Sequence, residues 1–194
     1  KAGFSHVSYG LESGSQNILN QMQKNLSLEI AEEVIRNTHS SGIYTTVNII
    51  VGYPAETEKE VLETADFLRR NAAFMNDIYF HPLVLMPDSP LYHHKDKFGI
   101  ELQNANEINL WYTSDGKNDY QIRLERIEFY KSILKDKYTS NISMFDYYLT
   151  LGEQFYKREE FEGALKFYLK AKNESRDIHK INLIENKISS IKKK

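Results

Sequence analysis

Two segments of the sequence place polar side chains directly after a short apolar run. Residues 10–15 read Gly-Leu-Glu-Ser-Gly-Ser, and residues 48–56 read Asn-Ile-Ile-Val-Gly-Tyr-Pro-Ala-Glu. Alternate residues of a strand share one face, so Asn48, Ile50 and Gly52 would present an amide, an apolar surface and a gap together. Such a trio suits a ribose hydroxyl that lies beside a flat base.

Charged and amide side chains near these segments could bind complementary groups. Glu12 and Asn48 carry oxygen acceptors at expected strand ends, and Lys24 carries a positive charge on a long stem that suits a carboxylate. Two of them also have plainer interpretations: Glu12 could cap the turn at residues 13–15, and Lys24 could be an exposed helix lysine. Glu56 is expected to cap a helix and shape its loop, with a direct cofactor contact as the alternative.

The other candidates for catalysis and metal binding are weaker. The chain has no cysteine, which excludes disulfides, cysteine nucleophiles, cysteine-ligated zinc and a cysteine-held iron–sulfur cluster within this chain. His93 and His94 are adjacent and would point in different directions on a helix, and Ser13 and Ser15 have no base to activate them. His81 is expected to pack at a sheet edge, with the lining of a substrate cavity as the alternative. We therefore expect no catalytic residue and no metal ligand in this chain.

Charge and hydropathy argue against two classes of partner. A formal net charge of −2 does not favour nucleic-acid binding by phosphate neutralisation. The longest apolar stretch, Val47 to Val51, is far shorter than the roughly 20 residues of a membrane helix. The chain begins Lys1-Ala2-Gly3, with no Met and no signal peptide, so we expect an excised piece of a cytoplasmic protein.

The elements that would position these residues alternate between strand and helix. We expect strands over residues 4–9, 44–51 and 78–86, with Pro82 making the third strand irregular or placing it near an edge. Strand, helix and strand in this order predict parallel βαβ units, whose apolar strands need cover on both faces. Three strands cannot close a barrel, so the expected α/β fold is part of a barrel or an open sheet with missing neighbours.

Caps and apolar stripes mark the two helices between these strands. Ser27 and Gly42 are the expected ends of the first helix, and Thr57 with Glu60 forms a capping box at the start of the second. The expected buried stripe of the first helix is Ile30, Ala31, Val34, Ile35 and Thr38. That of the second is Val61, Leu62, Ala65 and Leu68.

The character of the sequence changes near Glu101. Residues 104–119 are expected to form a loop around Trp111, and only helices are expected from Tyr120 onward. We place a boundary between residues 140 and 143, which gives domains 1–140 and 141–194.

The second domain resembles one tetratricopeptide repeat followed by a capping helix over residues 178–191. Small residues would let two antiparallel helices approach, and aromatic residues would fill the gaps between them. One such repeat cannot bury its own face, so it is expected to lean on the helix 123–138 or on another molecule. The positions that carry the resemblance are Tyr148, Leu151, Gly152, Phe155, Phe161, Ala164, Tyr168 and Ala171.

Four motifs in order carry a second resemblance over about residues 1–100. They are Gly-x-Glu-Ser-Gly-Ser from Gly10, Met-Gln-Lys-Asn from Met22, Val-Asn-Ile-Ile-Val-Gly-Tyr-Pro-Ala-Glu-Thr from Val47, and Met-Pro-Asp-Ser-Pro-Leu-Tyr from Met86. Together they resemble the carboxyl-terminal half of radical S-adenosylmethionine (SAM) enzymes. The branch they resemble most has an upstream cobalamin-binding domain and includes the anaerobic magnesium-protoporphyrin monomethyl ester cyclases.

The resemblance implies three parallel βα units of a half TIM-type barrel, and it implies a role for each site residue. Glu12 and Asn48 would bind ribose hydroxyls, and Lys24 would pair with the methionine carboxylate. Ile50 and Val84 would pack on adenine. Gly52 would allow close backbone approach.

The resemblance also implies cofactors, partners and an activity. SAM would bind here, a four-iron four-sulfur cluster would be held by cysteines of a missing amino-terminal half, and the use of cobalamin stays open. The chain would be an inactive fragment of an oxidoreductase of the cyclase type that acts on a small molecule. Two alternatives stay open: a protein-interaction module on a non-catalytic α/β scaffold, and an α/β enzyme that binds a nucleotide at Asn48 and Gly52 without a cluster.

Overall fold

The computed structural model describes residues 3–103, 108–135 and 143–192. The chain divides into two compact units, Lys1–Lys137 and Tyr138–Lys194. Residues 136–142 lie outside the described residues, and the predicted boundary between residues 140 and 143 falls at the end of that stretch. Among the described residues, no helix is long and apolar enough to cross a membrane.

The first unit is built on a three-stranded parallel sheet with the order β1-β2-β3. Its strands are β1 (His6–Glu12), β2 (Tyr44–Val51) and β3 (Asp77–Pro82). The connecting helices are α1 (Gln16–Gln21), α2 (Leu28–Ser40), α3 (Glu58–Asn71) and the short 3-10 helix η1 (Ala72–Phe74). The predicted parallel α/β arrangement is confirmed, while the barrel stays a prediction.

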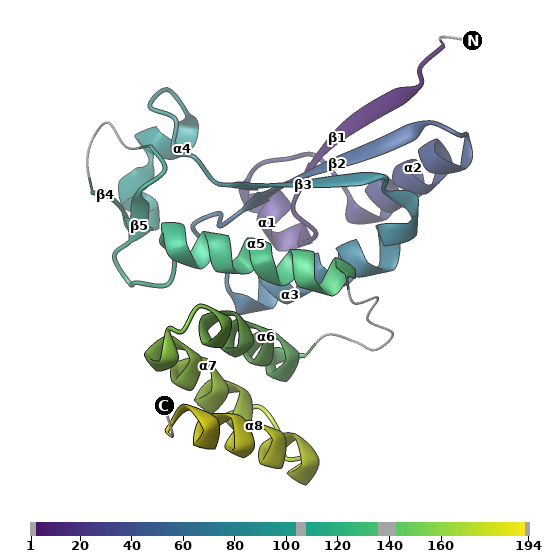
Figure 1. The fold of residues 1–194 in the computed structure, drawn as a ribbon. Coiled ribbons are helices and arrows are strands. Elements are labelled where there is room, and N and C mark those ends of the chain that lie inside the picture. Colours follow the sequence, from purple (N-terminus) through teal and green to yellow (C-terminus); the bar gives the residue numbers. More distant parts are fainter. Residues whose placement is uncertain (1–2, 104–107, 136–142, 193–194) are drawn as a thin grey trace. The chain divides into compact units, whose positions relative to one another are not determined.

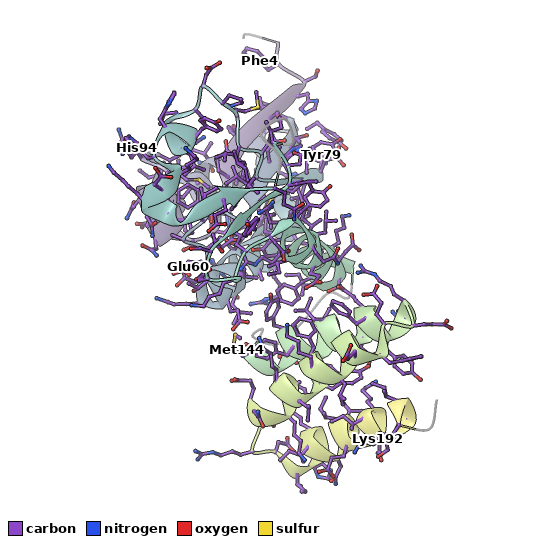
Figure 2. All side chains as sticks on the ribbon, turned by 90° about the vertical axis from the view of Figure 1, so that its left-hand side faces the viewer. Phe4, Glu60, Tyr79, His94, Met144 and Lys192 are labelled. Atoms are coloured by element: carbon purple, nitrogen blue, oxygen red, sulfur yellow. The ribbon has the colours of Figure 1, made fainter. Side chains whose placement is uncertain are left out.

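Helices cover one face of this sheet. Figure 1 shows α2, α3 and α5 (Tyr120–Lys135) on the same side of the strands, and α2 and α5 contact β2. On that side Val47, Ile49 and Val51 are almost completely buried. The opposite face carries more exposed side chains such as Tyr44 and Tyr79, the latter visible at the surface in Figure 2. The expected cover on both faces is therefore absent from the described part of the chain.

Two strands end elsewhere than predicted. β1 continues beyond Tyr9 to Glu12, and its register against β2 shifts between Gly10 and Glu12. β3 ends at Pro82 instead of continuing to Met86, because proline has no N–H to extend the ladder. The predicted edge position of this strand is confirmed for the described sheet, since β3 pairs with β2 alone.

The helix ends follow the predicted capping residues, but one apolar stripe is narrower than predicted. Ser27 precedes α2, and the Thr57 N–H donates to Glu60 Oε2 at 3.0 Å in the capping box of α3. In α2, Ala31 and Ile35 are buried, whereas Ile30 and Val34 are exposed. The helix therefore packs against the rest of the first unit along a single line of residues spaced four apart, and the positions beside that line are exposed to solvent.

The predicted loop around Trp111 contains a strand that sequence reasoning missed. After α4 (Pro90–His93) and η2 (Lys95–Phe98), the short strands β4 (Ile100–Leu102) and β5 (Trp111–Thr113) pair antiparallel. Trp111 is completely buried with Leu85 and Ile100, and its indole N–H donates to the Leu83 carbonyl oxygen at 2.9 Å. Three-residue strands escape detection by period because they show barely one alternation.

The second unit is helical. It contains α6 (Met144–Lys157), α7 (Phe161–Asn173) and α8 (Ile178–Ile191), and α7 contacts both neighbours. A side chain at Gly152 would meet the Tyr168 ring at 2.5 Å, so this glycine lets α6 and α7 approach closely. The predicted last helix is confirmed, and the tetratricopeptide resemblance stays a prediction.

Candidate functional site

The candidate site lies at the carboxyl ends of β1 and β2, where Gly10 and Asn48 are register partners. Lys24 follows α1 and reaches back over the end of β1. Its ammonium lies 2.8 Å from Glu12 Oε1 and 3.4 Å from the Gly10 carbonyl oxygen. The Lys24 side chain is 41% exposed and that of Glu12 is 17% exposed, so the cation is open to a further anionic partner.

Backbone geometry explains why Glu12 reaches this position. Glu12 has a φ of 71°, in the left-handed region that residues with a side chain rarely adopt. A Cβ atom at Gly10 would lie 2.6 Å from Glu12 Oε1, so only glycine leaves space for the carboxylate there. The shift in register and the glycine together turn Glu12 towards Lys24.

Hydrogen bonds orient the Asn48 amide. Its Nδ2 donates to Ser8 Oγ at 2.8 Å and to the Tyr9 carbonyl oxygen at 3.2 Å. Its Oδ1 lies 3.4 Å from Nε2 of His81, whose side chain is exposed on the neighbouring strand. His81 thus lies beside the candidate site, at the edge of the sheet.

The predicted apolar residues lie on adjacent strand ends. Ile50 is partly exposed and pairs in register with His81. The Leu83 N–H donates to the Val51 carbonyl oxygen at 2.9 Å, which holds the segment with Val84 against the end of β2. Val84 is also partly exposed.

Gly52 begins the loop after β2 and has a φ of 89°. Its N–H donates to Glu56 Oε2 at 2.9 Å, and Glu56 forms a buried ion pair of 2.9 Å with Arg126 of α5. Burial raises the pKa of the Glu56 carboxyl, and the Arg126 guanidinium and the Gly52 N–H oppose that rise. Glu56 therefore shapes the loop, as predicted, and its carboxylate faces the protein interior. The prediction that it caps a helix is wrong, because Thr57 and Glu60 cap α3.

The structure adds residues that sequence reasoning missed. Asn118, Arg123 and Arg126 are buried and reach the loop at Gly52 from the far end of the first unit's sequence. In the sequence, the feature that could have pointed to the buried arginines is their spacing of three residues inside a helix that is otherwise rich in apolar residues.

Other candidates lie elsewhere. His93 and His94 are exposed at the end of α4, and the described residues contain no group of three His, Asp or Glu that could hold a metal. Ser13 Oγ lies 3.2 Å from Thr64 Oγ1, and Ser15 Oγ donates to Glu63 Oε2 at 2.5 Å. These two hydroxyls join β1 to α3.

Comparison with family models gives a match for the first part of the chain. Residues 1–68 match the radical SAM superfamily, and this range contains β1, β2 and every predicted site residue except Val84. The match supports the predicted resemblance of this segment to radical SAM enzymes. The superfamily is one of enzymes that use SAM and a four-iron four-sulfur cluster, which agrees with the predicted resemblance.

Individual relatives are methylthiotransferases. The chain is 24% identical to threonylcarbamoyladenosine tRNA methylthiotransferase of Bacillus subtilis over 112 residues, which are 57% of this chain and 24% of that protein. It is 36% identical to tRNA-2-methylthio-N(6)-dimethylallyladenosine synthase of Syntrophomonas wolfei over 74 residues, which are 36% of this chain and 17% of that protein. The chain therefore spans about a quarter or less of the length of these relatives.

The side chains of the site fit SAM, but the chain does not fit the cluster. Lys24 offers a cation for a carboxylate, Glu12 and Asn48 offer acceptors for hydroxyl groups, and partly exposed Ile50 offers an apolar surface. The sequence contains no cysteine thiolate to hold iron and sulfur.

Proposed function

We propose that the first unit binds SAM at the carboxyl ends of β1 and β2, as one part of a longer radical SAM enzyme. The observation that carries this proposal is the arrangement of Lys24, Glu12 and Asn48. A carboxylate and an oriented amide lie on two register-paired strands, and a cation reaches them from the segment after α1. All three lie inside the segment that matches the superfamily.

Each side chain has a distinct task in this proposal. Lys24 has three N–H donors, so it can bind the methionine carboxylate while it keeps its contact with Glu12. Glu12 and Asn48 accept hydrogen bonds from the ribose hydroxyls. Ile50 and Val84 pack against adenine, and SAM supplies the radical chemistry once it is bound to the complete enzyme.

The Lys24 contact is tested by calorimetry. In the intact protein with its cluster reconstituted, Lys24→Ala should weaken SAM binding by about 1–3 kcal/mol, the range for a hydrogen bond to a charged group. Lys97→Ala is the matched control, because Lys97 is exposed on η2. Equal SAM affinities of Lys24→Ala and the wild type would contradict the assignment.

Two reactions are candidates for the whole protein. Similarity to methylthiotransferases supports transfer of a methylthio group, and the motif resemblance to the cobalamin-type cyclases supports oxidative ring closure. Both relatives carry tRNA in their names, whereas the net charge of −2 predicts that this chain does not bind nucleic acid by itself. Product mass distinguishes the reactions, because methylthio transfer adds the elements CH2S and oxidative closure removes hydrogen.

A protein-interaction module is the alternative from a different class. It is supported by exposed Leu169, Ile178 and Leu183 on the helical unit. The sequence that precedes residue 1 in the proposed longer protein distinguishes the radical SAM enzyme from the interaction module. A Cys-x-x-x-Cys-x-x-Cys motif there would support the radical SAM proposal and a cytoplasmic enzyme, and its absence from the intact gene would contradict it.

A further inference from the structure

The N–H group of Gly52 is held by a buried ion pair. Gly52 N–H donates to Glu56 Oε2 at 2.9 Å, and Arg126 Nη1 donates to the same oxygen at 2.9 Å. The side chains of Arg126 and Glu56 are 4% and 2% exposed. Because removal of one member leaves a buried charge without its counter-charge, Glu56 keeps this geometry only while Arg126 is present.

The carbonyl group of Gly52 is held by a second arginine through an amide. Asn118 Nδ2 donates to the Gly52 oxygen at 2.9 Å, and Asn118 Oδ1 accepts from Arg123 Nη1 at 3.1 Å. Arg123 Nη2 donates to the Trp111 carbonyl oxygen at 2.9 Å, and its guanidinium carbon lies 3.8 Å from the centre of the Trp111 ring. We call Glu56, Asn118, Arg123 and Arg126 the Gly52 clasp.

Steric contact completes the clasp. A Cβ atom at Gly52 would lie 2.3 Å from Arg123 Cγ, so the stem of Arg123 fills the place of a side chain. The close backbone approach expected at Gly52 stays a prediction, and the structure places the Arg123 stem beside this residue. The clasp therefore binds the peptide groups on both sides of this glycine, and its two arginines come from α5.

Arg123 stays charged at neutral pH. Burial lowers its pKa to about 10, with the nearby Asp119 acting in the opposite direction. Its charge and its contacts therefore persist under the conditions in which a cofactor would bind.

Buried charged groups distinguish the loop at Gly52 from the turn at residues 13–15, which follows β1. At the end of β1, Gly14 N–H donates to Thr64 Oγ1 at 3.1 Å, and Ser15 N–H donates to Ser13 Oγ at 3.1 Å. Neutral hydroxyl groups are enough to hold that turn. Only Val51 separates Ile50 from Gly52, so the charged clasp acts on the strand end that carries Asn48 and Ile50.

We propose that Arg123 and Arg126 are positioning residues of the SAM site, which set the direction of the β2 end so that Asn48 and Ile50 meet the adenosine part of SAM. This inference rests on the proposed function, because it assigns a role within the same site. It predicts that the clasp affects adenosine binding and leaves the Lys24 contact unchanged.

The test uses the whole chain with two probes that report different parts of the site. Affinities for 5′-deoxyadenosine and for methionine are measured by ligand-observed NMR titration with Arg126→Met, Arg126→Lys and Arg123→Lys. Arg70→Met is the control, because Arg70 pairs with Glu32 at the surface of the unit. In the Arg126 variants the affinity for 5′-deoxyadenosine should fall about 10- to 100-fold, the range for partners that orient a binding group. The affinity for methionine should not change.

Hydrogen exchange at Gly52 gives a readout that does not depend on a ligand. The Gly52 amide should exchange faster in Arg126→Lys than in the wild type and in Arg70→Met. Because this measurement uses Arg126→Lys, it tests the proposal even if Arg126→Met does not fold. A folded Arg126→Lys protein with wild-type exchange at Gly52 and wild-type affinity for 5′-deoxyadenosine would overturn the positioning role alone. A wild-type chain that binds neither SAM nor 5′-deoxyadenosine would overturn the proposed function and, with it, this inference.

Discussion

At the end of β1, the absence of a side chain at Gly10 determines where the Glu12 carboxylate can lie. Gly10 leaves the space into which the Glu12 carboxylate folds, and the left-handed backbone of Glu12 turns it towards Lys24. Such a backbone costs about 1–2 kcal/mol in a residue with a side chain. The ion pair is partly exposed and worth at most about 1 kcal/mol, so stability alone does not account for this conformation.

Alanine at Gly10 should therefore affect mainly SAM binding, whereas alanine at Gly52 should affect mainly the stability of the fold. Gly10→Ala displaces only the end of the Glu12 side chain, so we expect weaker SAM binding by about 1–2 kcal/mol with little loss of stability. Gly52→Ala meets the Arg123 stem and a positive φ, so we expect the free energy of unfolding to fall by about 2–4 kcal/mol. Calorimetry and urea unfolding measure the two effects. A Gly10→Ala protein that binds SAM like the wild type would contradict a role for Glu12.

At the scale of elements, the capping box of α3 links stability to pH. Burial acts to raise the pKa of Glu60, but hydrogen bonds from the Thr57 side chain, the Thr57 N–H and Asn17 lower it below its ordinary value of 4.5. A carboxyl with a depressed folded-state pKa stabilises the fold above its unfolded-state pKa, and this contribution is lost as pH falls through the folded-state pKa. Figure 2 shows Glu60 at the lower end of the first unit.

We expect the free energy of unfolding to decrease as the pH falls below about 4.5, and to decrease less steeply in Glu60→Gln. Urea unfolding between neutral pH and pH of about 3 measures the slope. Identical slopes for the variant and the wild type would show that this carboxyl contributes nothing to acid sensitivity.

The α6–α7 pair reverses the usual effect of a helix glycine. Replacement of glycine by alanine inside a helix normally stabilises it by about 0.5–1 kcal/mol. Gly152→Ala should instead destabilise the second unit by about 1–3 kcal/mol, because the new methyl group overlaps the Tyr168 ring. Hydrogen exchange of the α6 and α7 amides measures this loss, with Thr150→Ala on the same helix as the control. A more stable Gly152→Ala protein would mean that the two helices have room to separate.

At the scale of the whole molecule, the two units differ in what they contain. All six predicted SAM contacts lie in the first unit, which has its own buried core. A chain cut after residue 140 should therefore retain its fold and bind SAM as the full chain does. Circular dichroism and calorimetry on the shortened chain test this. If that chain does not fold, the helices are required to cover the first unit.

Patterns with enough repeats were predictable from the sequence. The eight residues of β2 are mostly β-branched or apolar, the Thr57 capping box has a fixed spacing, and the last helix carries nearly four turns of periodic apolar residues. The strands β4 and β5 were missed because three residues are too few to show a period. Ile30 and Val34 were predicted to be buried but are exposed. The sequence of a helix shows which residues are apolar, but it does not show how much of that apolar face the neighbouring elements cover.

The sequence by itself determined the parallel α/β order, the strand that carries Asn48 and Ile50, and the resemblance to radical SAM enzymes. These depend on local periodicity and short motifs, which the order of residues records directly. Only the tertiary structure showed that Glu12 contacts Lys24 and that Arg123 and Arg126 hold Gly52. Those contacts join residues far apart in the chain. Whether the arginines reach Gly52 depends on the packing of α5 against the sheet, and whether Lys24 reaches Glu12 depends on the backbone of β1 at Gly10 and Glu12. No local pattern specifies either.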